Sequence, residues 1–169
     1  MRIRAAAALT ALVVAGSLVI GVGAASAKSS KAPPCAGSTK SAAIKAVKKA
    51  YDLFLNGTIK PPRTLAARKL SIEGISDPAL SALFDKTQAA NAATAATTTI
   101  KLSAVKCTGK SAANVTADLV VAGQTLKGIF PNPGGAVIEA GVWKVSKRTF
   151  CDLETLSDPN LAKSGPCAV

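Results

Sequence analysis

The sequence predicts an α+β domain in which N-terminal helices pack against a four-stranded antiparallel meander. Apolar residues recur at helical spacing as far as about Gln88, and beyond Thr99 they alternate with polar residues as in a half-buried strand. The turns between the strands are short, whereas a parallel crossover needs roughly a dozen residues or more, so neighbouring strands are expected to run antiparallel. The helices are then expected to cover one face of the sheet.

Three helices are expected in the first half of the chain. The first begins at Ser41 and ends at Asn56-Gly57, and the second covers Thr64 to Leu70 with Thr64 as its N-cap. The third follows Asp77, which caps a helix running to about Gln88. The apolar stripe of the first helix consists of Ile44, Val47, Tyr51, Phe54 and Leu55.

Four strands and a final helical turn are expected in the second half. Ala89 to Thr99 is low in complexity and is either a frayed helix end or a linker. The strands centre on residues 100–104, 115–121, 126–130 and 143–145, with Asn132-Pro133-Gly134-Gly135 as one of the turns, and the helical turn spans Phe150 to Leu156. Alternation places one set of side chains on the face turned away from the helices: Lys101, Asp118, Lys127 and Lys144.

The first 27 residues have the pattern of an export signal. Arg2 and Arg4 form a basic start, Ala5 to Ala25 carry no charge, and Ala25-Ser26-Ala27 is a small-x-small cleavage site. The alternative is an uncleaved anchor, because roughly 20 apolar residues can span a bilayer. The cleavage pattern favours a signal peptide that is removed after Ala27, and therefore a secreted protein.

The mature chain is expected to have three parts. Residues 28–40 form a polar, exposed lead-in, residues 41–157 form a single α+β domain, and residues 158–169 form a disulfide-tethered C-terminal tail. A chain of this length fits one domain with its own hydrophobic core.

The four cysteines, an even number in an exported chain, predict two disulfides in one of three connectivities. Cys151 and Cys167 are expected to pair because both lie in the last 20 residues, and Cys35 with Cys107 then follows by elimination. The spacings match no zinc pattern and there is no CxxC, so we expect neither a metal nor another cofactor.

The charge balance is strongly basic. The chain has 21 Lys and Arg against nine Asp and Glu, and loss of Arg2 and Arg4 with the signal peptide leaves a net charge of about +10. This charge keeps a secreted domain soluble, or it attracts anionic surfaces such as cell-wall polymers. Nucleic acid is not an expected partner, because the lysines are scattered and the few aromatic residues do not interleave with them.

Histidine is absent, which excludes Ser-His and Cys-His nucleophilic pairs. It also removes the most common metal ligand and the most common general base in proteins.

The segment Gly141-Val142-Trp143-Lys144-Val145-Ser146, followed by Thr149-Phe150-Cys151, resembles the low-molecular-weight secreted antigen group of actinobacteria. This group is similar to the nuclear transport factor 2-like superfamily, and the resemblance extends over Ser41 to Leu156. It implies a curved, cone-like sheet wrapped around the helices, an apolar pocket inside the cone and a homodimer formed through the sheet.

Enzymes of that superfamily use acid and base residues inside the cone, commonly Asp with His or Tyr. This chain departs from the pattern, because it has no histidine, Asp118 is at an outward position of its strand, and Tyr51 belongs to a core stripe. The resemblance therefore supports a fold and weakens the expectation of an enzyme.

Aromatic residues form the candidate binding site. If the cone encloses a pocket, its lining is expected to be Tyr51, Phe54, Phe84, Phe130 and Trp143. Aromatic residues at helical and strand spacing are more often plain core, which is the simpler interpretation.

Three functions follow from these observations. The favoured one is a secreted, non-catalytic domain that binds a small apolar ligand or a protein partner. The second is a cationic protein that associates with anionic cell-wall or surface polymers. The third is a small lyase or isomerase that uses Tyr51 with a carboxylate such as Glu73 or Asp85.

Overall fold

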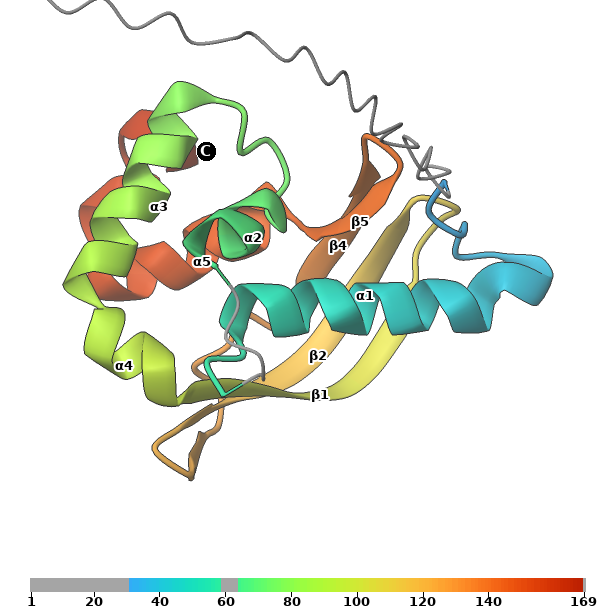
Figure 1. Ribbon diagram of the computed structural model, residues 1–169, viewed down its shortest axis with the longest axis horizontal. Helices are drawn as coiled ribbons and strands as arrows, with labels where there is room; N and C mark the ends of the chain where they lie inside the picture. The colour runs from blue at the N-terminus through green and yellow to red at the C-terminus, as the bar shows by residue number, and fades with distance from the viewer. Residues whose placement is uncertain (1–30, 59–63, 169) are drawn as a thin grey trace, which may run out of the picture.

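A computed structural model describes residues 31–58 and 64–168 (Figure 1). The predicted signal peptide and its cleavage site lie outside these residues. Within the described ranges, none of the helices has both the length and the apolar character that a membrane crossing requires.

The helical part precedes most of the sheet, as the hydrophobic spacing predicted. The helices are α1 (Lys40–Leu55), α2 (Leu65–Leu70), α3 (Pro78–Ala90), α4 (Ala92–Thr97) and α5 (Lys147–Ser157), with short 3-10 turns η1 (Gly37–Thr39), η2 (Pro159–Ala162) and η3 (Gly165–Cys167). Helix α1 lies across the concave face of the sheet (Figure 1). Its buried side chains are Ala43, Val47, Ala50, Tyr51 and Phe54.

The strands form a curled antiparallel sheet, and the predicted α+β class is confirmed. They are β1 (Thr98–Cys107), β2 (Ala112–Val121), β3 (Gln124–Leu126), β4 (Gly134–Glu139) and β5 (Val142–Val145). The main path in the described residues is β1-β2-β4-β5, and the short β3 pairs with β2. This path is the predicted four-stranded meander, and it curls as a half-barrel around α1 (Figure 1).

The third strand of the meander differs from the prediction. Residues 126–130 were expected to form it, but β3 ends at Leu126 and a turn follows. The third strand is instead β4, which begins at Gly134 inside the predicted turn. Phe130 lies outside any strand and is still buried.

The two glycines at the start of β4 explain this difference. A Cβ on Gly134 would come within 2.9 Å of both the Phe130 ring and the Tyr51 hydroxyl, and a Cβ on Gly135 within 2.6 Å of the Ser146 hydroxyl. The glycines are therefore present because the strand is closely packed on both sides, and not because the chain turns. The Asn132 side chain continues the hydrogen bonding between β4 and β2 beyond Gly134, because it accepts from Ala117 N and donates to Ala117 O.

The helix caps follow the sequence more closely. Thr64 accepts a hydrogen bond from the Ala67 amide, and Asp77 accepts from the amides of Ala79 and Leu80, so both predicted N-caps are confirmed. Ile44 and Leu55 are only half-buried, because α1 turns the smaller Ala43 and Ala50 toward the sheet. The low-complexity segment contains the separate helix α4 and the start of β1.

The cysteines form two disulfides, Cys35–Cys107 and Cys151–Cys167, as predicted. The first joins the lead-in to the end of β1, and the second joins α5 to the C-terminal segment. The lead-in is more firmly attached than its polar composition suggests: Cys35 is buried, and the Pro33 carbonyl accepts a hydrogen bond from the Trp143 indole.

The outer face of the sheet is polar. Lys101 lies opposite Asp118 in the register of β1 and β2, and Lys144 pairs with Glu139 at 2.6 Å. Lys127 was expected on this face but lies in the turn after β3, because that strand is short.

Replacing Gly134 tests the packing at the start of β4. Gly134→Ala should lower the free energy of unfolding by about 1–3 kcal/mol, because the new methyl group meets the Phe130 ring and the Tyr51 hydroxyl. The matched control is Gly109→Ala, where a Cβ meets no atom within 4 Å. Urea unfolding of the oxidised proteins measures both, and equal stability of the two variants would contradict the packing explanation.

Candidate functional site

The five aromatic residues of the candidate pocket all lie in the hydrophobic core. The rings of Tyr51 and Phe130 are 6.0 Å apart, and those of Phe54 and Phe84 lie 6.1 and 6.2 Å from the ring of Phe150. Within the described part of the chain, none of these five residues lines the cavities characterised below.

Tyr51 is held by the sheet and not by a carboxylate. Its hydroxyl donates to the Gly135 carbonyl at 2.7 Å, and burial raises the pKa of the phenol well above its usual range, while a hydrogen bond with Thr149 opposes the shift. The two carboxylates considered as its catalytic partners are bonded elsewhere. Glu73 accepts from the Lys147 amide, and Asp85 pairs with Lys69 at 2.6 Å.

A groove among the short helices is the main candidate site. It has a volume of about 390 Å³ and is lined by residues of α2, α3 and α4 and by Gly57, which follows α1. This volume is within the range of small-molecule sites, about 300–1,000 Å³. The lining residues are Gly57, Leu65, Arg68, Asp85, Gln88, Ala89, Ala92, Ala95 and Ala96.

Arg68 is the principal polar group of this groove. Its Nε donates to the Phe54 carbonyl in the last turn of α1 at 3.2 Å, which fixes the guanidinium against a rigid helix. Half-burial lowers the pKa of this guanidinium, since removal from water disfavours the charged form. Arg68 makes no ion pair with any described residue, and Asp85 in the same groove is already paired with Lys69.

Gln88 contributes the second polar group. Its buried Oε1 has no hydrogen-bond partner among the described residues. Gln88 and Arg68 together line both this groove and a smaller adjoining recess of about 120 Å³ that reaches Leu55 and Thr98. An unsatisfied buried amide oxygen costs free energy, so Gln88 Oε1 is the polar atom of this groove that most lacks a hydrogen-bond donor.

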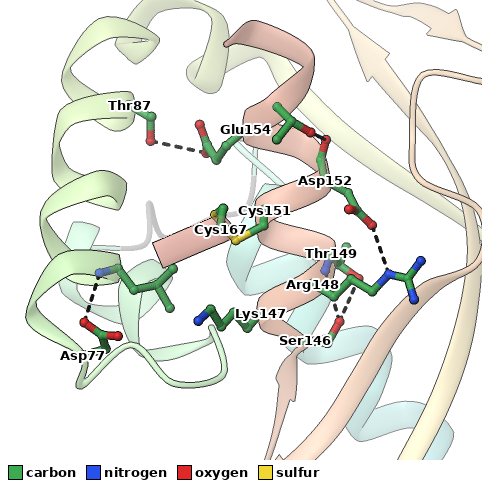
Figure 2. The surroundings of a disulfide bond; sticks show 12 residues. Asp77, Thr87, Ser146, Lys147, Arg148, Thr149, Cys151, Asp152, Glu154 and Cys167 are labelled. Carbon is green, nitrogen blue, oxygen red and sulfur yellow. Dashed lines mark hydrogen bonds and ion pairs between the residues drawn. A yellow bond between two sulfur atoms is a disulfide. The ribbon is translucent and has the colours of Figure 1, made fainter. Parts of the chain in front are cut away.

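A buried carboxyl, Glu154, lies in a different cavity between α3 and α5. Its carboxyl faces Thr87 at 3.3 Å (Figure 2), and the cavity of about 170 Å³ is also lined by Lys86 and Asp158. Burial raises the pKa of Glu154 to about 7, and the hydrogen bond with Thr87 opposes this shift. Since the Thr87 hydroxyl also lies 3.1 Å from the Phe84 carbonyl, a protonated Glu154 can donate to Thr87 while Thr87 donates to Phe84.

A third recess surrounds the C-terminal disulfide. It has a volume of about 400 Å³ and lies beside Cys151–Cys167, with Lys147, Arg148 and Asp152 at its rim (Figure 2). Arg148 is largely exposed and lies 3.7 Å from Asp152, one turn along the helix. Elsewhere in the described residues, no group of three Cys, Asp or Glu side chains is arranged to hold a metal ion.

Sequence reasoning missed the polar groups of these cavities. Arg68 and Gln88 are polar residues in short helices, and nothing in their spacing indicates that they face the same groove. Glu154 had a signal that was not used: it follows Phe150 by four residues and Cys151 by three, so it belongs to the buried face of α5.

The fold defines a class: a small α+β protein with two disulfides, whose only tyrosine is hydrogen-bonded to the backbone of the sheet. Residues 41–160 match the model of the family described as low molecular weight antigen MTB12, C-terminal domain. The chain belongs to this family. Searches of curated proteins and of solved structures gave no match. The disulfides and the membership in an antigen family are consistent with secretion.

The raised pKa of Glu154 predicts a stability that falls as the pH rises. The Glu154 carboxyl has an ordinary pKa of 4.5 and a pKa of about 7 in the folded state. Its protonation therefore stabilises the folded state fully below pH 4.5, and this contribution is lost as the pH rises through 7. Glu154→Gln stays neutral and should not show this loss. Relative to the wild type, the variant should gain on the order of 2 kcal/mol between pH 4.5 and pH 8, measured by urea unfolding.

Glu139→Gln is the control of opposite sign. The hydrogen bond from Lys144 lowers the pKa of Glu139, so this carboxylate stabilises above its unfolded-state pKa and the contribution is lost as the pH falls. The Glu139 variant should therefore lose stability relative to the wild type near neutral pH and not in acid. A Glu154 variant with the same pH profile as the wild type would show that this carboxyl is not held protonated.

Proposed function

We propose that this protein is an exported, non-catalytic domain that binds a small ligand in the groove among α2, α3 and α4. The observation that carries the proposal is a ligand-sized groove lined by both Arg68, which forms no ion pair with a described residue, and Gln88, whose buried Oε1 has no hydrogen-bond partner among the described residues. The aromatic core supports it indirectly, because the five aromatic side chains first considered are buried and line none of the cavities characterised above in the described residues.

Export with cleavage after Ala27 belongs to the same proposal. The Ala25-Ser26-Ala27 site, the two disulfides and the antigen family all support it. The half-barrel around α1 likewise supports a place in the nuclear transport factor 2-like superfamily, with the ligand outside the cone. The binding of a small molecule at this edge requires no second copy of the chain.

Native mass spectrometry of protein collected from the medium of the producing cells tests this function. The expected species begins at Lys28, lacks four hydrogens because of its two disulfides, and carries a small-molecule adduct. Ala92→Trp should remove the adduct, because Ala92 lines the groove and an indole there fills it. The matched control is Ala93→Trp, at an exposed neighbour outside the lining. An adduct that survives Ala92→Trp, or a ligand-free wild type, would count against the groove as the binding site.

A second candidate function rests on an uneven distribution of charge. Seven exposed lysines lie on the lead-in, on α1 and on the hairpin of β1 and β2, and neither residues 31–51 nor residues 103–117 contain an acid. This set, called the lysine end, consists of Lys31, Lys40, Lys45, Lys48, Lys49, Lys106 and Lys110. The Cys35–Cys107 disulfide holds its two segments together. We infer that this end attaches the protein to an anionic cell-wall polymer.

Salt-dependent retention on an anionic resin tests this second function. Replacing Lys45, Lys48 and Lys49 together by Gln should lower the eluting salt concentration, because exposed charges act through screened long-range attraction. The matched control replaces Lys101, Lys127 and Lys163 by Gln, which removes the same net charge from other surfaces. Equal elution of the two triple variants would show that only net charge matters and that the lysine end is no specific surface.

A further inference from the structure

The groove is lined by a cation that forms no ion pair with a described residue. Arg68 is fixed through its Nε to the Phe54 carbonyl, and that hydrogen bond leaves its two terminal nitrogens available to a ligand. No acidic side chain among the described residues pairs with it. A partly buried charge is costly unless an opposite charge accompanies it, so the missing partner is an anion.

Gln88 adds a second polar group for that anion. Its Oε1 is buried without a partner among the described residues, and a half-turn of the amide places the NH2 group there, where it can donate to an anion. A carboxylate has two oxygens at one planar head. One oxygen can accept from the Arg68 guanidinium and the other from the Gln88 amide.

The remaining lining residues limit the net charge of the ligand and the chemistry of its tail. Asp85 faces the same groove and forms an ion pair with Lys69, so a dianion such as phosphate would be placed near a carboxylate. The other walls are apolar and small. They are Leu65, Ala89, Ala92, Ala95 and Ala96.

We propose that the ligand of this groove is a small monocarboxylate with an apolar tail, whose head is bound by Arg68 and Gln88 and whose tail lies along the alanines of α3 and α4. The proposal rests on the proposed function, since it names the chemical class that the same groove takes.

Octanoate and octan-1-ol, which have the same chain length, are the probes of this proposal. Both are titrated into the full oxidised mature chain labelled with ¹⁵N, and binding is followed by NMR at the Gln88 side-chain amide and the Ala92–Ala96 backbone amides. Octanoate should shift these signals and bind at least tenfold more tightly than octanol. Preference for octanol, or equal binding, would overturn the anion assignment while leaving the groove as a ligand site.

Variants of the protein separate the contribution of the ligand's head group to binding from that of its tail. Arg68→Met keeps an apolar stem and should abolish the preference for octanoate, whereas Lys48→Met, which removes one charge from the lysine end, should preserve it. Gln88→Leu is the second variant in case Arg68→Met fails to fold, which its near-UV circular dichroism would reveal. It should lower octanoate affinity more than octanol affinity.

The remaining outcomes distinguish failure of the monocarboxylate proposal from failure of the proposed function. Octanoate shifts confined to the lysine end would overturn the monocarboxylate site and indicate surface charge attraction instead. If neither probe shifts the groove signals, the ligand class is wrong. A natural adduct that Ala92→Trp removes would then still support the groove as a binding site, and loss of both results would overturn both proposals.

Discussion

The contact between α1 and the start of β4 is the constraint on which the rest of the fold depends. Tyr51 donates its hydroxyl to the Gly135 carbonyl, and Gly134 lacks the side chain that would separate the two elements. The same segment of β4 is also hydrogen-bonded to the residues that follow β5. The Gly135 amide donates to the Thr149 hydroxyl, and the Gly135 carbonyl accepts from the Ser146 amide. One close approach therefore sets the position of the central helix, the third strand of the meander and the first turn of α5.

This close packing decides where function can lie. The Tyr51 phenol is fully buried, and its hydroxyl donates to a backbone carbonyl and not to a carboxylate of the described residues. The one buried side-chain atom without a partner among the described residues, Gln88 Oε1, lies at the periphery, in the groove that α2 and α4 also line. The binding proposed there would leave the core undisturbed, as in small domains that carry their sites on peripheral elements.

The sequence predicted the parts of the fold that depend on local chemistry. Thr64 and Asp77 cap their helices because a short oxygen-bearing side chain satisfies free amides wherever it precedes a helix. The error at β4 arose because glycine has two uses: a pair of glycines predicts a turn, but here it permits close packing against Tyr51 and Ser146. The groove was not predictable, since Arg68 and Gln88 are 20 positions apart and meet only through the tertiary arrangement of α2 and α3.

The packing of the core also bears on the selectivity that we propose for the groove. An exposed arginine at the edge of a short helix would lose much conformational entropy on binding a ligand. The Phe54 carbonyl removes part of that cost by holding the Arg68 Nε before any ligand arrives, and Phe54 is itself packed against Phe150 in the core. The packing of Phe54 in the core thus orients Arg68, the cation among the described lining residues of the groove. In the proposed binding mode, the buried aromatic residues act on binding through the position of Arg68, and not through contact with a ligand.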